Sequence, residues 1–365
     1  MSKQTIFHAD QVGSLLRTDA IKQARIDRDE GKLSAEELRE IENREIIRII
    51  EKQKETGIKV ITDGEFRRAW WHFDFLEELK GVEGYWSGSG IQFQETQTKS
   101  RAIKVTGKLD FDQHSFIEHF KFLKKHVGDD HIAKYTIPSP SMLHFRGEVD
   151  PDVYPDESVF FDDLAATYKK AIQAFYDAGC RYLQLDDTAW AYLCSTEQRE
   201  ELIAKGKDPE KLIQHYLDTL NKAVADRPDD LKITMHICRG NFRSTWISSG
   251  GYEPVAEQIF GKLNIDGFFL EYDNERSGGF EPLRFVNRPD LQIVLGLITS
   301  KHGQLEDAES IKQRIDEATK YVPLDQLSLS PQCGFASTEE GNLLTEEEQW
   351  EKLRHVVSIA NDVWK

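Results

Sequence analysis

The 365-residue sequence contains little cysteine and no long hydrophobic run. Its four scattered cysteines, Cys180, Cys194, Cys238 and Cys333, are too few for a disulfide scaffold, so we expect free thiols. No apolar run approaches the roughly 20 residues of a membrane helix, and the first residues lack the basic and apolar parts of a signal peptide. These absences predict a cytoplasmic protein without membrane contact.

Basic residues are also in short supply. The sequence has 47 lysines and arginines against 64 aspartates and glutamates, which gives a net charge of −17. A surface of this sign repels phosphate backbones, so we expect small-molecule substrates and no nucleic-acid partner. The composition leaves the oligomeric state open.

Eight short apolar segments alternate with amphipathic, helix-like stretches along the whole chain. This alternation and the chain length predict a closed TIM (β/α)8 barrel of the α/β class, formed by residues 1–365 as a single domain. No G-x-G-x-x-G follows the first segment, which disfavours an open dinucleotide-binding sheet. The eight segments are one that ends at Ser14 and residues 58–65, 134–141, 181–187, 231–238, 265–273, 291–300 and 326–333.

Residues 66–130 are too long for one connection between a strand and its helix. They predict an insertion after the second strand, built as a hairpin with residues 103–111 as one of its strands. Elsewhere, Ser34 and Glu37 have the spacing of a helix capping box, and Gly57 follows the end of that helix. Further helices are expected over residues 161–178, 195–225 and 305–321.

Metal-binding side chains gather at the ends of the apolar segments, where a barrel carries its chemistry. His236 and Cys238 point to one face because side chains alternate along a strand. Together with Cys333 and Glu271 they offer one nitrogen, two sulfurs and one oxygen, a set suited to tetrahedral Zn²⁺. The alternative for an isolated H-x-C pair is a buried cysteine beside a core histidine.

The other two cysteines have different expected roles. Cys180 lies in a helix-to-strand turn at the opposite rim, and we expect it in the core. Cys194 is expected to pack in a helix, and it is the spare ligand if Glu271 is not one.

Six motifs make the sequence resemble a known family. They are QVGSLLR, TDGEFRR, LQLDD, MHICRGNF, FLEYD and SPQCGF, in this order along the chain. With them the sequence is similar to the cobalamin-independent methionine synthases, in a short form that has only the carboxyl-terminal catalytic barrel. The resemblance covers nearly the whole chain, and it supports the barrel prediction.

The resemblance implies a zinc-dependent methyltransferase that forms methionine from homocysteine. It implies Zn²⁺ bound by His236, Cys238, Glu271 and Cys333. It also implies that Glu65 and Asp186 bind the amino group of homocysteine and that the hydroxyl and backbone around Ser14 bind its carboxylate. Outside the family reading, the two acids would form salt bridges with arginines such as Arg67 or Arg17.

The sequence departs from the family in the residues that face the methyl donor. Where the family has a histidine as proton donor on strand seven, this chain offers Lys301 or His302. Asp186 is followed by Asp187 where the family has a glutamate, and Asp187 is a candidate substrate-binding residue with a shorter side chain. The donor implied is 5-methyltetrahydrofolate or another methyl carrier, including a corrinoid.

Three other functions remain open at this stage. The first is zinc-dependent alkyl transfer to a different thiol, such as coenzyme M. The second is a non-enzymatic zinc-binding paralogue, and the third is a metal-free barrel resembling uroporphyrinogen decarboxylase. Displacement of a metal ligand by homocysteine would distinguish an enzyme from the second, and metal analysis would exclude the third.

Overall fold

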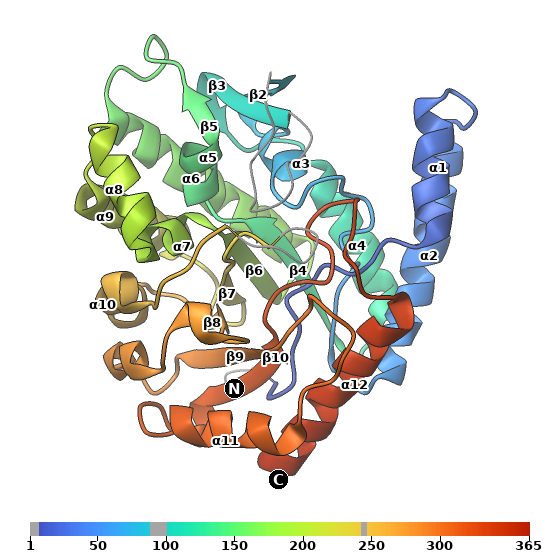
Figure 1. Cartoon of the computed structure of the whole chain (residues 1–365). Helices are drawn as coiled ribbons and strands as arrows, with labels where there is room; N and C mark the ends of the chain where they lie inside the picture. Colours follow the sequence, from blue (N-terminus) through green and yellow to red (C-terminus); the bar gives the residue numbers. More distant parts are fainter. Residues whose placement is uncertain (1–6, 88–100, 242–246) are drawn as a thin grey trace.

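Seven parallel strands form the central sheet of the computed structural model, which describes residues 7–87, 101–241 and 247–365. The sheet curls, and helices cover its outer face (Figure 1). Its strand order is β1-β4-β6-β7-β8-β9-β10, so each strand lies beside the next apolar segment of the chain. The strands are β1 (Val60–Ile61), β4 (Ile132–Pro138), β6 (Tyr182–Asp187), β7 (Lys232–Ile237), β8 (Gly267–Glu271), β9 (Gln292–Ile298) and β10 (Leu327–Pro331).

The first apolar segment lies between the two edge strands. Ala9 forms a parallel bridge to Leu329 of β10, and Ser14 forms one to Gly64, three residues beyond β1. The backbone amide of Leu15 also donates to the Gly64 carbonyl at 3.0 Å. The eight predicted segments therefore share one curled sheet, which confirms the TIM-like α/β class.

The helices follow the strands on the outside. The predicted capping box at Ser34 is present at the start of α2. The helix ends at Glu55, two residues before the predicted stop at Gly57. None of the helices among the described residues is long and apolar enough to cross a membrane. The longer helices are α1 (Asp19–Asp29), α2 (Ala35–Glu55), α4 (Ser115–Val127), α6 (Glu157–Asp177), α8 (Thr196–Ala204), α9 (Pro209–Val224), α10 (Glu253–Lys262), α11 (Ala308–Ala318) and α12 (Glu346–Val363).

The single helix expected over residues 195–225 is wrong. Two helices, α8 and α9, occupy this stretch. Gly206 has φ +74°, a left-handed conformation that ends the first helix, and Asp208 caps the second with its side chain. Pro209 then occupies the first turn of α9, where its missing N–H costs nothing.

A second, smaller sheet is built from two strands that precede β4 in the chain and one that follows it. Strands β2 (Lys80–Trp86) and β3 (Arg101–Asp110) pair antiparallel, and β3 pairs with β5 (Gly147–Val149) in parallel. β3 contains the strand expected at 103–111, except for residue 111. The connection between β2 and β3 includes residues 88–100, which lie outside the described part of the chain, so the boundaries of the insertion at 66–130 stay a prediction.

Alternate residues of the barrel strands place layers of polar side chains in the interior, and two of these layers contain acidic groups. At one level, the buried Asp10 carboxylate accepts hydrogen bonds from Lys134 Nζ at 3.2 Å and from Tyr182 Oη at 2.7 Å. Asp186 lies four residues further along β6 and is paired with His236 of β7 in the strand register. The second layer therefore lies at the carboxyl ends of the strands, where barrels hold their active sites.

Candidate metal and substrate site

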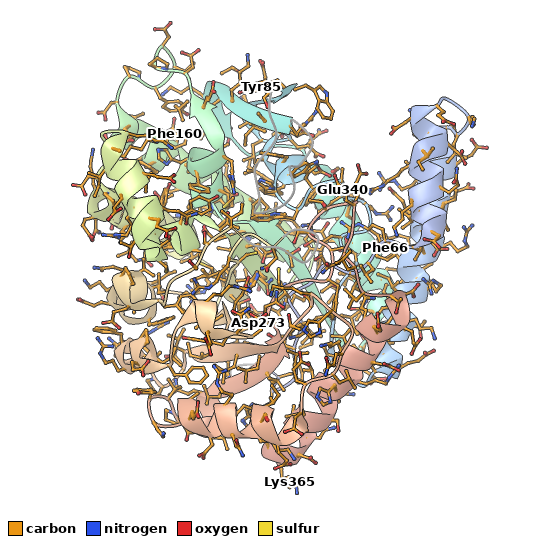
Figure 2. The ribbon with its side chains drawn as sticks, in the orientation of Figure 1. Phe66, Tyr85, Phe160, Asp273, Glu340 and Lys365 are labelled. Atoms are coloured by element: carbon orange, nitrogen blue, oxygen red, sulfur yellow. The ribbon has the colours of Figure 1, made fainter. Side chains whose placement is uncertain are left out.

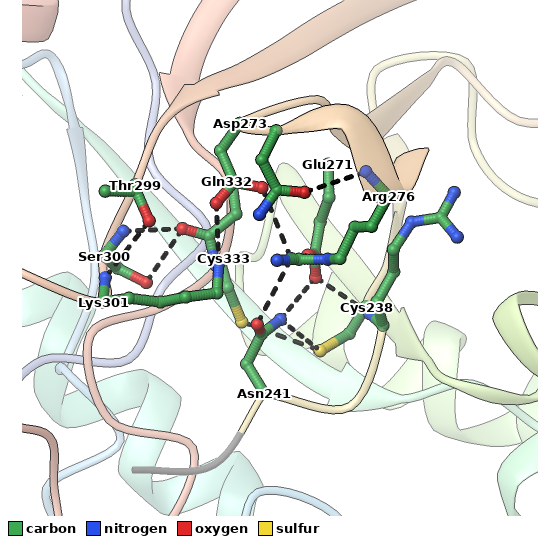
Figure 3. A network of polar contacts seen from close by, with 12 residues as sticks. Cys238, Asn241, Glu271, Asp273, Arg276, Thr299, Ser300, Lys301, Gln332 and Cys333 are labelled. Carbon is green, nitrogen blue, oxygen red and sulfur yellow. Dashed lines mark hydrogen bonds and ion pairs between the residues drawn. The ribbon is translucent and has the colours of Figure 1, made fainter. Parts of the chain in front are cut away.

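Four side chains from three strand ends meet in one buried cluster. The potential ligand atoms of His236, Cys238, Glu271 and Cys333 all lie within 4.8 Å of one another. His236 and Glu271 belong to β7 and β8, Cys238 follows β7, and Cys333 follows β10. The two Sγ atoms are 3.7 Å apart (Figure 3). The structure thus brings together the four residues that the sequence selected.

The chemistry of this cluster suits a thiophilic divalent cation. Within the described part of the chain, both ring nitrogens of His236 are buried without a hydrogen-bond partner. The hydrogen bond with Cys333 lowers the pKa of Cys238 and raises that of Cys333, so the pair favours one thiolate. Burial raises the pKa of Glu271. An orphaned imidazole, a shared thiolate and a buried carboxyl form a donor set that fits Zn²⁺.

The Glu271 carboxylate receives hydrogen bonds on both oxygens. Its Oε1 accepts from Asn241 Nδ2 at 2.6 Å and from the Arg239 backbone amide at 2.9 Å. Its Oε2 accepts from Arg276 at 2.5 Å. Asn241 Nδ2 is also 3.5 Å from Cys238 Sγ, so one amide contacts two members of the cluster.

Asp273 lies between two cations next to the cluster. Its Oδ2 is 2.6 Å from Lys301 Nζ, and its Oδ1 is 3.3 Å from Arg276. In the view of Figure 2, Asp273 lies near the centre of the molecule. Of the two predicted proton donors, Lys301 is therefore connected through Asp273 and Arg276 to the candidate metal cluster, whereas His302 is exposed.

Glu65 and Asp186 are buried near each other on the other side of the site. Glu65 has φ +60°, directly after Gly64 at φ +66°. Its Oε1 accepts from Thr136 Oγ1 at 2.9 Å, and its Oε2 is buried without a partner among the described residues. Burial raises the pKa of Asp186 to about 7, and the charge of Glu65 also contributes. Two adjacent carboxyls in a buried site attract a cationic group.

Of the arginine salt bridges considered for these acids, one forms for Glu65, but with Arg68 and not with Arg67 or Arg17. Arg67 pairs with Glu42, and Arg17 donates to backbone carbonyls. The cation near Glu65 is Arg68 instead, at 3.4 Å, and its guanidinium also stacks over the ring of Phe116. Asp186 accepts a hydrogen bond from Gln184 at 2.7 Å.

Ser14 and Asp187 lie in different surroundings. The Ser14 hydroxyl is buried and accepts a hydrogen bond from the Ala336 amide at 3.4 Å, close to the loop that carries Cys333. The Asp187 carboxylate is fully buried, accepts hydrogen bonds from Ser139 and Ser141, and accepts a third from the Trp190 amide at 2.9 Å. Its oxygens thus already have three donors from neighbouring loops.

The two remaining cysteines lie outside the metal-binding cluster. Cys180 is fully buried, and its thiol donates to the Tyr182 carbonyl at 3.3 Å. Cys194 is the last residue of α7 (Ala189–Cys194) and is buried in the hydrophobic core. Both positions agree with the packing roles predicted for them.

Comparison with known proteins identifies the family. The chain matches the model of the cobalamin-independent synthase catalytic domain over residues 7–362. The chain belongs to this family. YxjG of Bacillus subtilis (strain 168), a protein of uncharacterized function, is 62% identical over 364 residues, which cover 100% of this chain and 96% of YxjG. The methionine synthase of Saccharolobus solfataricus is 24% identical, and the match covers 92% of this chain and 90% of that protein.

Solved structures of related synthases share the fold. A Listeria monocytogenes protein assigned to the vitamin-B12-independent methionine synthases has 57% identity and a TM-score of 0.83, with 99% of each chain covered. A B12-independent methionine synthase from a Shewanella species, solved with selenomethionine, has 21% identity and a TM-score of 0.72, with 98% of each chain covered. This second likeness concerns the fold alone.

Sequence reasoning missed three side chains that surround the predicted ligands. Arg276, Asn241 and Thr136 contact Glu271, Cys238 or Glu65, yet none ends an apolar segment in the way that drew attention to the ligands. Asn241, three residues after Cys238, carried the only available signal, its closeness in the sequence.

Proposed function

We propose that the protein is a zinc-dependent methyltransferase that transfers a methyl group to the thiol of homocysteine and forms methionine. The observation that carries this proposal is the buried cluster of His236, Cys238, Glu271 and Cys333, whose ligand atoms lie within 4.8 Å of one another. Membership of the family and the methionine synthases among its relatives support the reaction type.

The four clustered residues would hold the metal ion. When bound, Zn²⁺ would lower the pKa of a substrate thiol, so that the thiol reacts as a thiolate at neutral pH. The protein's own contribution is to bury the cluster and to keep Glu271 oriented through Asn241, Arg239 and Arg276. Fixed, buried ligands keep the site in one arrangement between turnovers.

Glu65 and Asp186 would bind the ammonium group of the amino-acid substrate. The unpartnered Oε2 of Glu65 and the raised pKa of Asp186 both indicate that the site would stabilise a positive charge. The hydroxyl of Ser14 would donate to the substrate carboxylate. A thiol without an amino-acid head, such as coenzyme M, would leave the two acids unpaired, which favours homocysteine.

Lys301 would supply the proton that the leaving group needs. Its ammonium lies 2.6 Å from Asp273 Oδ2 in a mostly buried position, and this contact holds the side chain beside the candidate metal cluster. His302, the other candidate, would act from the exposed side of the same loop. The methyl donor, 5-methyltetrahydrofolate or another methyl carrier, would bind on the side of the site that carries Lys301 and His302. Asp187 would hold the loops after β4 and β6 around the donor.

The test combines metal analysis with a methionine-formation assay. Wild-type protein, Cys333→Ser and Cys180→Ala are assayed with homocysteine and a panel of methyl donors that includes a methyltetrahydrofolate and a methylated corrinoid. We expect one zinc per chain and methionine formation in the wild type and in Cys180→Ala, and loss of both in Cys333→Ser. Cys180→Ala is the matched control because its thiol is also buried, but in the core.

Three outcomes would contradict the proposal. Activity that survives in Cys333→Ser would exclude the metal-dependent reaction. Stoichiometric zinc without methionine from any donor would favour a non-enzymatic zinc protein. Turnover with coenzyme M but not with homocysteine would identify a different acceptor.

A further inference from the structure

We infer that Arg276 is a positioning residue for the metal ligand Glu271, and that Asp273 holds Arg276 in place. This inference rests on the proposed zinc site and deepens it. Figure 3 shows the three side chains in one network of polar contacts beside the two thiols.

The contact between Arg276 and Glu271 is short and enclosed. Arg276 lies 2.5 Å from Glu271 Oε2, with 5% of the arginine side chain and none of the glutamate side chain exposed. Little water reaches such a pair, so its attraction is only weakly screened. The guanidinium is the closest cation to the Glu271 carboxylate among the contacts of the described residues.

The local backbone directs Arg276 back toward the strand that carries Glu271. Arg276 lies in the 3-10 helix η1 (Glu275–Ser277), and the side chain of Asn274 caps this helix by accepting from the Arg276 amide at 3.1 Å. The Arg276 carbonyl accepts from the Gly250 amide at 2.9 Å. Both backbone groups of Arg276 are therefore fixed, which leaves its side chain few alternatives.

Asp273 connects Arg276 to Lys301. Its carboxylate is 3.3 Å from Arg276 and 2.6 Å from Lys301, with 2% of its side chain exposed. Two carboxylates, Glu271 and Asp273, thus alternate with two cations along one chain of contacts. In this arrangement Asp273 prevents Arg276 from moving away from Glu271, and the same carboxylate orients the proposed proton donor.

The consequence for the metal site is a carboxylate that faces the thiols in one orientation. The Arg239 amide and Asn241 fix Oε1, and Arg276 fixes Oε2. Partners of this kind orient metal ligands in proteins, and their loss typically weakens metal binding about 10- to 100-fold. A lysine in place of Arg276 keeps the charge but lacks the planar fork, so it should restore part of the effect.

The experiment measures metal affinity in Arg276→Met, Arg276→Lys and the wild type. Zn²⁺ dissociation constants come from competition with a chromophoric chelator, and the visible spectrum of Co²⁺-loaded protein reports the ligand geometry. Arg284→Met is the matched control: this arginine lies in the next 3-10 helix, pairs with Glu253, and has 46% of its side chain exposed.

We expect Zn²⁺ binding about 10- to 100-fold weaker in Arg276→Met with an altered Co²⁺ spectrum, an intermediate value in Arg276→Lys, and no change in Arg284→Met. Equal affinity and equal spectra in wild type and Arg276→Met would overturn the inference and leave the proposed function intact. A wild type that binds no metal would overturn both. If Arg276→Met fails to fold, Asp273→Asn takes its place, and wild-type affinity and an unchanged Co²⁺ spectrum in that variant would overturn the inference.

Discussion

A single buried histidine makes the stability of the fold sensitive to acid. His119 lies in α4, and burial, with Arg67 as the next cause, lowers its pKa to about 2. Its folded pKa is below its unfolded value of about 6.5. The folded state is therefore fully stabilised above pH 6.5, and it loses about 1.4 kcal/mol for each pH unit as the pH falls from there toward 2.

Urea unfolding at pH 7, 6 and 5 tests this prediction. The unfolding free energy of the wild type should fall with acidification more steeply than that of His119→Gln, which has no proton to gain. The two proteins share every other titrating group, so the difference isolates His119. Parallel curves would contradict the assignment.

Residue identity at strand ends could be predicted from the sequence, whereas the partners of those residues could not. His236 and Cys238 follow from strand alternation, whereas Glu271 lies near the end of the sixth segment and Cys333 ends the eighth. Arg276 reaches Glu271 only through the turn that Asn274 caps, and a turn of this kind leaves no periodic pattern.

Among the elements, the helices α5 (Ser141–Arg146) and α7 are joined through one carboxylate. Ser139 and Ser141 donate to Asp187 from the loop and first turn of α5, and Asp187 accepts from the Trp190 amide in α7. All three polar side chains are buried. This link fixes the loops after β4 and β6 relative to each other, next to Asp186.

Removing either hydroxyl should weaken the link. Ser139→Ala or Ser141→Ala leaves a buried carboxylate with one donor fewer, which we expect to cost about 1–3 kcal/mol in the free energy of unfolding. Ser158→Ala serves as the control because its hydroxyl bonds Asp156 in an exposed position, and it should change stability by less than about 0.5 kcal/mol. Equal stability of all three variants would show that the link contributes nothing.

Elements that repeat were predicted better than elements that interrupt the repeat. The strands of the barrel and the capping box of α2 could be located from periodicity. The division between α8 and α9 was missed although Gly206, Asp208 and Pro209 carry the local signals of a helix end and a new helix start. The small sheet of β2, β3 and β5 includes strand pairing between distant segments, which no local pattern encodes.

For the whole molecule, a buried ion pair ties the first segment to the barrel interior. Asp10 and Lys134 have no exposed side-chain surface and lie 3.2 Å apart. Asp10→Asn leaves Lys134 buried and without its counter-charge, and we expect a loss of about 3–5 kcal/mol in the free energy of unfolding. Lys134→Met should cost a similar amount.

The double variant distinguishes an ion pair from two independent contributions. Asp10→Asn combined with Lys134→Met removes both charges, so its loss of stability should be smaller than the sum of the single losses. Chemical denaturation of the four proteins gives this coupling energy. Strict additivity would contradict the pairing.

The closed-barrel architecture was predicted from the number of segments, but the residues that pair at its closure were not. Eight segments in 365 residues predict a barrel, and seven of them pair in sequence order. The register between the first segment and β10 is set by contacts between distant parts of the chain. No local sequence pattern encodes this register.

That closure has a consequence for synthesis on the ribosome. His8 Nδ1 bonds the Leu327 carbonyl at 2.9 Å, across 319 positions of the chain. The segment around His8 must therefore wait for β10 to be synthesised before it reaches its place, and the nascent barrel has two open strand edges until then. Such late, distant pairing slows folding and exposes strand edges to aggregation, so chaperone protection matters most before β10 has been added.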